Sequence, residues 1–441
     1  MEQQLETASN SISLSAYWRL VRENRNFRNL WMAQIVSEIG DWFYTLAIYN
    51  LLLQLTGRAS SVALALVVQV LPQTFMGPFA GVVNDRLSRK RVMITTDLLR
   101  ALVVLAMLLV RSRSNVWMIY PLLLLESSMW AFFEPARTAT IPNVTSGEDL
   151  LVANTLSSTT WSLNLVAGAS IGGVALALLG RNALFVLNTL SFLASAYFLS
   201  RMRFRELHAE AAAKIAASYW TAYSSILDGI RYVRHDSRRL ALVFIKTGLA
   251  QMGVSWVLFT VMGQRVFPLH WPGLDPERGG VLGMSMLLGA RGVGAIVGPL
   301  FSARWAGSSE RRLRLGVLFG FLAVAAGYAT LGAAMSLWQA CFFVVLAHSG
   351  GSTVWVFSTT LLQLNTDDKF RGRVFSAELG LAMVTLAIGS YLTGFVIDRG
   401  IAPRTVAIAT GLFMLIPACA WALAMRLWKQ ETAAVDPQPS I

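Results

Sequence analysis

The sequence has few charged residues: they occupy 14% of its 441 positions, against 55% for the AVILMFWYC group, and the mean hydropathy is +0.54. A soluble domain has about 25% charged residues. Apolar runs recur from Trp31 almost to Trp428, and no polar stretch between them is long enough for a water-soluble module. The composition therefore argues against a soluble enzyme and indicates a chain surrounded largely by lipid.

Cysteines and catalytic signatures are scarce as well. The two cysteines, Cys341 and Cys419, lie in apolar runs without the CxxC or Cys/His spacing of a disulfide framework or a zinc site. There is no His-Glu-x-x-His motif, and the glycine-rich stretch 289–298 lacks the Lys-Ser/Thr sequel of a phosphate loop. We therefore expect neither enzyme activity nor a metal or other cofactor.

Twelve apolar segments are long enough to cross a bilayer, because a hydrocarbon core of about 30 Å needs roughly 20 residues per helix. We expect these segments at approximately 31–55, 60–83, 92–112, 116–139, 152–179, 182–202, 239–263, 280–303, 313–332, 336–363, 374–398 and 403–427. Residues 1–30 are polar and do not resemble a signal peptide, so the first segment is expected to stay in the mature protein. The sequence thus predicts an all-α membrane protein with twelve transmembrane helices and both termini on one side.

The positive charges indicate the orientation, since short cytoplasmic loops carry an excess of lysine and arginine. Of the 37 such residues, 26 lie in the termini and the loops on their side, 8 lie in the opposite loops and 3 lie within segments. Both termini are therefore expected in the cytoplasm, and the membrane is expected to be a bacterial-type inner membrane. The net charge of +13 would also suit a nucleic-acid partner, but the basic residues sit at membrane boundaries, so no such partner is expected.

Two traces of an internal repeat indicate that the chain has two similar halves. Gly77-Pro78 in the second segment matches Gly298-Pro299 in the eighth, at an offset of 221 residues. Residues 127–132 in the fourth segment match residues 352–357 in the tenth, at an offset of 225. We expect two pseudo-symmetric six-helix bundles that enclose a site near the bilayer midplane.

The two predicted bundles are residues 1–202 and residues 239–441 with a short tail, joined by a polar linker at 203–238. Within the linker, apolar side chains recur at helical spacing: Tyr219, Tyr223, Ile226, Ile230 and Val233. This pattern predicts an amphipathic helix on the cytoplasmic membrane face, and a passive connector is the alternative.

The loop after the second segment carries a family resemblance. Residues 81–91 read GVVNDRLSRKR and resemble the Gly-x-x-x-Asp-Arg-x-Gly-Arg-Arg signature of the major facilitator superfamily, with Ser88 in place of the second glycine. Residues 27–41, 132–154 and 371–374 are similar to the proton-driven efflux branch that includes macrolide-efflux and enterobactin-export proteins. Together these matches span residues 27 to about 376.

The resemblance implies the major facilitator fold and a secondary active transporter. Such a protein would export amphipathic small molecules, drug-like or siderophore-like, in exchange for protons. A lipid or lysophospholipid flippase, a proton-coupled uptake symporter and a ligand-binding receptor are the alternatives. The expected partners are a small-molecule substrate, protons and the lipid bilayer, and the protein is expected to be a monomer. One departure is Ala169, which stands where many antiporters have the proline of Gly-Pro-x-x-Gly-Gly.

Ionisable residues within the segments are candidates for function, because each is costly in lipid. A polar stripe at i, i+4, i+7 and i+11 of the first segment should line a cavity, and it consists of Gln34, Glu38, Asp41 and Thr45. We predict that Asp41 or Glu38, together with Glu126, carries the proton, since burial and like charges favour a protonated acid and a nearby cation opposes it. A structural ion pair, for example Asp41 with Arg291, is the alternative.

The predicted substrate cavity combines this stripe with polar and aromatic residues of other segments. It comprises Gln34, Thr45, Trp130, Phe133, Lys246, Arg291, His348, Trp355 and Gln363. Aromatic rings offer broad contact to a bulky cargo, although ordinary helix packing is the alternative for each of them. Arg291 would suit a carboxylate, catecholate or phosphate on the substrate, or else a protein acid. His348 would alternatively relay protons.

The resemblance also implies a cytoplasmic latch, because charged groups at helix ends can pair in one conformation and separate in another. Its first members follow the second segment and are Asp85, Arg86 and Arg89. Asp97 and Arg100 are three residues apart, and we expect them to pair with each other or to extend the latch toward Glu134 and Arg137.

Overall fold

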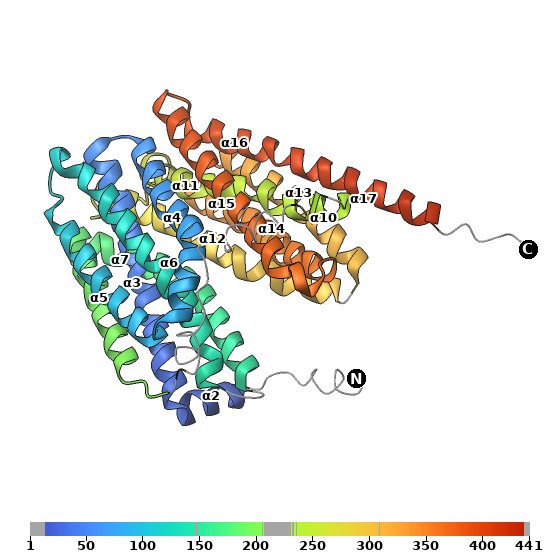
Figure 1. Cartoon of the computed structure of the whole chain (residues 1–441). Coiled ribbons are helices and arrows are strands. Elements are labelled where there is room, and N and C mark those ends of the chain that lie inside the picture. The colour runs from blue at the N-terminus through green and yellow to red at the C-terminus, as the bar shows by residue number, and fades with distance from the viewer. Residues whose placement is uncertain are drawn as a thin grey trace, which may run out of the picture.

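The computed structural model describes residues 14–145, 149–204, 206, 231, 233–234, 236–307 and 309–435. Nearly all of these residues lie in helices, and none of them forms a β-strand (Figure 1). The helices are α2 (Leu14–Glu23), α3 (Arg25–Thr56), α4 (Ala59–Arg86), α5 (Arg89–Ala106), α6 (Ile119–Val144), α7 (Asp149–Ser200), α10 (Ser237–Leu249), α11 (Val254–Arg265), α12 (Pro276–Ala306), α13 (Glu310–Ala333), α14 (Leu337–Leu364), α15 (Asp368–Asp398), α16 (Pro403–Phe413) and α17 (Leu415–Val435). Three short 3₁₀ turns connect the helices. One follows α5 at Met107–Leu109, one precedes α6 at Arg113–Met118, and one joins α10 to α11 at Ala250–Gly253.

Capping residues in the sequence explain where several helices begin and end. Asn24 starts α3, because its side chain accepts a hydrogen bond from the Phe27 amide at 2.9 Å. Asp275 caps α12 in the same way. Gly57 ends α3 with a left-handed φ of 67°, a conformation that glycine adopts without a steric penalty. Only Gly57 and Arg58 separate α3 from α4, so these two helices are antiparallel neighbours.

Among the described residues, ten helical stretches are long and apolar enough to cross a membrane. The 52-residue α7 is one of these stretches, although its backbone breaks at Gly180, where φ is 76° and ψ is 167°. The 32-residue α3 is not among the ten, because its polar stripe lowers its hydropathy. The prediction of an all-α membrane protein is confirmed, while the count of twelve transmembrane helices stays a prediction.

The helices form two groups. In the first group, α3 lies along α7, and α5 packs against both α6 and α7. In the second group, α14 packs against α12 and α13, and α16 covers α13 (Figure 1). The groups meet where α7 lies along α12 and α4 lies along α15. The approach of α7 to α12 is close, since a Cβ atom at Gly173 would overlap the side chain of Ser285.

The predicted boundary at 202/203 falls just after α7, and the one at 238/239 falls within the first turn of α10. These boundaries stay predictions. Most of the linker, including Tyr219, Tyr223, Ile226 and Ile230 of the predicted amphipathic helix, lies outside the described residues.

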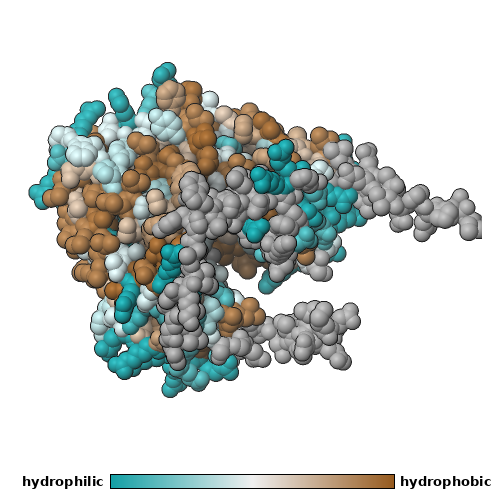
Figure 2. All heavy atoms as spheres, in the orientation of Figure 1, coloured by the Kyte–Doolittle hydropathy of each residue, from teal (hydrophilic) through white to brown (hydrophobic). Residues whose placement is uncertain are grey.

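Large apolar side chains cover the flanks of the molecule. Those more than half exposed include Leu102, Leu178, Leu190, Phe301 and Phe342. Figure 2 shows apolar residues over the side of the first group and hydrophilic residues gathered at the end where α2 lies. An apolar flank of this extent is what a lipid environment requires, since water would disfavour it.

Candidate functional site

A cavity of about 370 Å³ lies mainly within the first group of helices. Its walls come from α3, α4, α5, α6 and α7, and Trp256 of α11 joins them from the second group. Of the residues predicted for the site, those that line it are Gln34, Glu38, Asp41, Thr45, Arg100, Glu126, Trp130, Phe133, Glu134 and Arg137. The polar stripe of α3 therefore faces a cavity.

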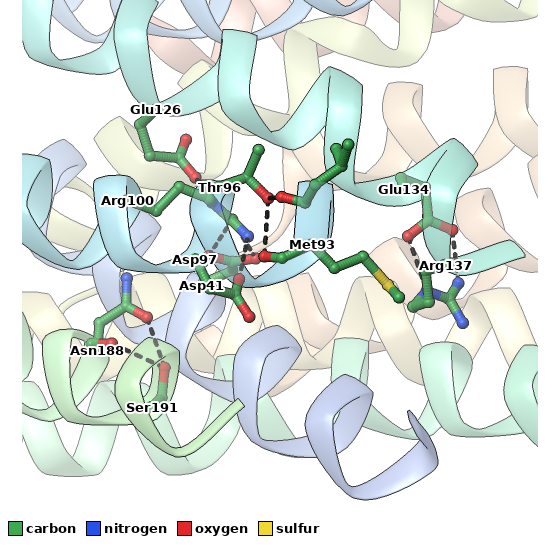
Figure 3. A network of polar contacts seen from close by, with 11 residues as sticks. Asp41, Met93, Thr96, Asp97, Arg100, Glu126, Glu134, Arg137, Asn188 and Ser191 are labelled. Atoms are coloured by element: carbon green, nitrogen blue, oxygen red, sulfur yellow. Dashed lines mark hydrogen bonds and ion pairs between the residues drawn. The ribbon is translucent and has the colours of Figure 1, made fainter. Parts of the chain in front are cut away.

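Arg100 of α5 is the centre of a buried charge cluster (Figure 3). Its Nη2 atom donates to both carboxylate oxygens of Asp41, at 2.8 and 2.9 Å. The same atom donates to Oε1 of Glu126 at 2.7 Å, and Nε donates to that oxygen at 2.9 Å. One guanidinium thus joins α5 to α3 and α6. The ring of Phe192, 4.1 Å from the guanidinium carbon, covers one face of the guanidinium plane.

A second cluster lies along the same cavity. Arg137 of α6 donates to both carboxylate oxygens of Glu134, at 2.5 and 2.9 Å, and to the Gln34 side-chain oxygen at 2.9 Å. Gln34 donates in turn to Glu38 at 2.8 Å, and Asn164 of α7 donates to the other oxygen of Glu38 at 2.8 Å. Hydrogen bonds therefore connect Glu38 of α3 with helices α6 and α7.

Among the described lining residues, carboxylates outnumber guanidinium groups. The four acids are Glu38, Asp41, Glu126 and Glu134, and the two bases are Arg100 and Arg137. With all six groups ionised, the lining carries an excess of two negative charges. Because uncompensated charge is costly at low dielectric, protons or a cationic ligand would stabilise this arrangement.

The predicted cavity residues of the second half lie elsewhere. Lys246 of α10 forms a buried ion pair with Glu378 of α15, at 2.8 Å, and its ammonium group lies 4.6 Å from the centre of the Trp355 ring. Neither Lys246 nor Trp355 lines the cavity. His348 is buried against Tyr328, with 3.3 Å between Nε2 and the phenol oxygen, and Gln363 is exposed.

Arg291 lies behind the cavity wall. Its guanidinium carbon is 3.9 Å from the centre of the Trp256 ring. The same ring stacks with Trp42 of α3, with centroids 5.6 Å apart and an angle of 18° between the ring planes. Nη1 of Arg291 is buried without a hydrogen-bond partner among the described residues. Asp41 therefore pairs with Arg100, and the Asp41–Arg291 pair considered from the sequence is absent from this part of the structure.

The residues predicted for the cytoplasmic latch are divided between two places. Arg89 donates to the Ala139 carbonyl at 2.8 Å, which ties the start of α5 to α6. Arg86 is exposed, and the side chain of Asp85 lies outside the described part of the structure. The predicted pair of Asp97 and Arg100 is present at 3.8 Å, but it lies with the charge cluster at the cavity.

Several lining residues were missed by the sequence reasoning. They are Ser37, Trp42, Tyr44, Tyr49, Leu66, Gln69, Val70, Gln73, Ser127, Trp161 and Trp256. Helical spacing offered a signal for Ser37, which is one turn before Asp41 and three residues after Gln34. Trp256 carried no such signal, because it belongs to the other half of the chain.

Comparison with known proteins defines the class. The nucleoside transporter NupG superimposes with a TM-score of 0.71 at 10% sequence identity, covering 90% of this chain and 98% of that one. A structure titled for substrate recognition in proton dependent oligopeptide transporters gives a TM-score of 0.67 at 14% identity, covering 92% and 99%. The fold is that of the major facilitator superfamily, as predicted, and the protein is a multi-pass membrane transporter and not an enzyme.

The model of the family described as transmembrane secretion effector matches residues 17–440, and the chain belongs to this family. The putative bacilysin exporter BacE of Bacillus subtilis (strain 168) is 25% identical over 352 residues, which are 79% of this chain and 83% of that protein. Macrolide efflux protein A of Streptococcus pyogenes is 23% identical over 387 residues, or 87% and 90% of the two chains. These relatives are efflux-type transporters.

Proposed function

We propose that the protein exports amphipathic small molecules from the cytoplasm in exchange for protons. The observation that carries this proposal is the buried cluster in which Arg100 is shared by Asp41 and Glu126 at the edge of a cavity with excess negative charge. Relatives named as exporters of bacilysin and macrolides support the direction of transport. The expected bacterial inner membrane and cytoplasmic termini are part of the same proposal.

The proposed coupling follows from competition for the carboxylates. A cavity that carries two uncompensated negative charges is stabilised either by protons or by a substrate with a positive group, and each reduces the need for the other. A substrate that binds from the cytoplasm releases protons, and protons that enter from outside displace the substrate. The inward proton gradient then drives export without a nucleotide.

The cavity wall also favours certain cargoes. The rings of Trp42, Trp130, Phe133, Trp161 and Trp256 line the cavity and offer apolar contact to a bulky molecule. The volume of about 370 Å³ lies in the range of small-molecule sites. Neutral or cationic drug-like cargo suits the acid-rich lining better than an anionic siderophore, because like charges repel at low dielectric.

The function can be tested in bacterial cells that lack their own drug pumps. Cells with the protein should extrude a cationic dye faster than empty-vector cells, and a protonophore should remove the difference. A panel of neutral, cationic and catecholate compounds, with a lysophospholipid as competitor, then defines the cargo. Efflux that is insensitive to the protonophore would reject proton coupling, and competition by the lysophospholipid alone would favour a flippase.

The Asp41 carboxylate provides the residue-level test. Asp41→Asn should lower efflux to the level seen with a protonophore, because the amide cannot take up and release a proton, while the amount of folded protein in the membrane stays unchanged. Glu23→Gln is the matched control, since Glu23 is exposed on α2 and away from the cavity lining. Undiminished proton-driven efflux by the Asp41→Asn variant would show that Asp41 is not essential.

A further inference from the structure

Asp97 occupies an unusual position beside the charge cluster. It lies on α5 one turn before Arg100, its side chain is 0% exposed, and it does not line the cavity. Within the described part of the chain, neither of its carboxylate oxygens has a hydrogen-bond partner. A buried carboxylate without hydrogen bonds is costly, so its presence calls for an explanation.

The nitrogen atoms of the Arg100 guanidinium differ in their hydrogen bonding. Nε and Nη2 donate to Asp41 and Glu126, whereas Nη1 is buried and has no hydrogen bond to any described residue. This atom faces Asp97, with 3.8 Å between Nη1 and Oδ1. Charge-assisted hydrogen bonds have lengths of about 2.7–2.9 Å, so a shift of about 1 Å would form one.

Among the described residues, the surroundings of Asp97 contain one cation and further acids. Arg100 faces it from α5 through Nη1, whereas Asp41 of α3 and Glu126 of α6 bind the same guanidinium through Nη2 (Figure 3). Ser195 of α7 lies beside Asp97, and its buried hydroxyl is placed to donate to that carboxylate, although it makes no close hydrogen bond to any described residue. In the part of the chain that the structure describes, Arg100 is therefore the ionic partner within reach of Asp97.

We propose that Asp97 is the second binding partner of Arg100, used when Asp41 and Glu126 are neutralised. In the present arrangement Arg100 joins α5 to α3 and α6. Once protons or a cationic substrate neutralise the two cavity acids, Arg100 turns to Asp97, and its contact is then confined to α5. The ties to α3 and α6 are released, which links occupancy of the cavity to helix movement. This inference rests on the proposed function and deepens it.

Asp97 acts here as a positioning residue. A guanidinium that left Asp41 and Glu126 with no other acid nearby would be buried and unpaired, a state that is strongly disfavoured. Asp97 makes the state in which Arg100 has left Asp41 and Glu126 accessible, because its negative charge still balances the charge of Arg100. The protein therefore keeps three acids for one buried base, which a purely structural ion pair does not require.

A thermodynamic cycle tests the inference without any transport measurement. The double variant Asp41→Asn with Glu126→Gln mimics the neutralised acids, so its Arg100 should depend on Asp97. Adding Asp97→Asn to this variant should lower its melting temperature in detergent by about 5 °C or more, whereas Asp97→Asn in the wild-type background should lower it by about 2 °C at most. Equal losses in both backgrounds would overturn the inference.

Two further variants make the cycle decisive. Asp97→Glu added to the double variant keeps the carboxylate and should restore most of the melting temperature, and Glu23→Gln should change neither background. If the triple variant with Asp97→Asn cannot be isolated, isolation of the triple variant with Asp97→Glu supports the inference, and loss of both triple variants counts against it.

Efflux measurements separate this inference from the proposed function. If wild-type efflux is insensitive to a protonophore, the proposed function fails, whatever the cycle shows. If wild-type efflux is proton-driven and the cycle is additive, only the role of Asp97 fails. With both correct, the single Asp97→Asn variant should bind substrate with an affinity within about threefold of wild type and lose most of its proton-driven efflux.

Discussion

Single residues carry buried charge in two different ways in this protein. In the first group of helices, Arg100 is shared among several acids at a cavity. In the second group, Lys246 and Glu378 form a one-to-one pair that is 5% and 0% exposed and lies away from the cavity. The first arrangement has more acids than bases and can exchange partners. The second is a closed pair, with one acid for one base, and it holds α10 against α15.

The closed pair leads to a prediction about stability. Lys246→Met alone should destabilise the protein by about 3–5 kcal/mol, because it leaves the Glu378 carboxylate buried and unpaired. The double variant Lys246→Met with Glu378→Leu should recover most of that loss, since apolar side chains of similar size replace the pair. Thermal unfolding in detergent measures both effects. Efflux by the double variant should stay near wild type, and its loss would show that the pair takes part in transport.

At the scale of helices, small residues set how closely neighbours approach. Gly263 of α11 lies against the backbone of α12, and a Cβ atom there would overlap the main chain at Met284. In contrast, a Cβ atom at Gly77 of α4 would meet no described atom within 4 Å. The contact between α11 and α12 therefore depends on the absence of a side chain, as is common in membrane helices.

These two glycines form a matched pair for an experiment. Gly263→Ala should destabilise the protein by about 1–3 kcal/mol, because backbone atoms must move to make room. Gly77→Ala should leave stability unchanged or raise it by up to about 1 kcal/mol, since alanine favours the helix. The melting temperatures of the two variants in detergent provide the measurement, and an equal response would contradict the close packing of α11 on α12.

Across the whole molecule, the two groups of helices are joined at the end away from α2 (Figure 1). Asp398 of α15 accepts hydrogen bonds from the amides of Ala59 and Ser60, at 2.7 and 3.0 Å, and so caps the start of α4. Arg265 of α11 donates to the Gly57 carbonyl at 2.7 Å, at the end of α3. An anion thus meets a helix N-terminus and a cation meets a helix C-terminus, as the helix dipoles favour.

These contacts of Asp398 and Arg265 should control access at that end, which is the outer end in the predicted topology. Asp398→Ala with Arg265→Ala removes three hydrogen bonds that involve charged groups, each worth about 1.5–3 kcal/mol, so opening should become more frequent by tenfold or more. A cysteine replacing Ser60, in a background without Cys341 and Cys419, should then react with a membrane-impermeant maleimide correspondingly faster. An unchanged rate would show that other contacts hold this end closed.

Much of the fold could be predicted from the sequence. Segment positions follow from runs of apolar residues, and the described helices α4 to α6 and α12 to α15 lie where such runs were found. The stripe from Gln34 to Thr45 was visible because helical spacing places these residues on one face, and they do line the cavity. The pairing of Asp97 with Arg100 was visible for the same reason.

Contacts between helices could not be predicted in this way. The sequence allowed Asp41 to pair with Arg291, but Arg100 binds it and Arg291 lies on Trp256. Likewise, Lys246 and Trp355 were placed in the cavity because they are polar or aromatic within a membrane, yet Glu378 compensates Lys246 away from it.

The sequence by itself determined that this chain is a helical membrane protein and which residues share a helix face, because hydropathy and the helical repeat act between near neighbours. The tertiary structure decided which acid meets which base. That choice depends on how each helix is rotated and how closely it packs, which is set by side chains far apart in the chain.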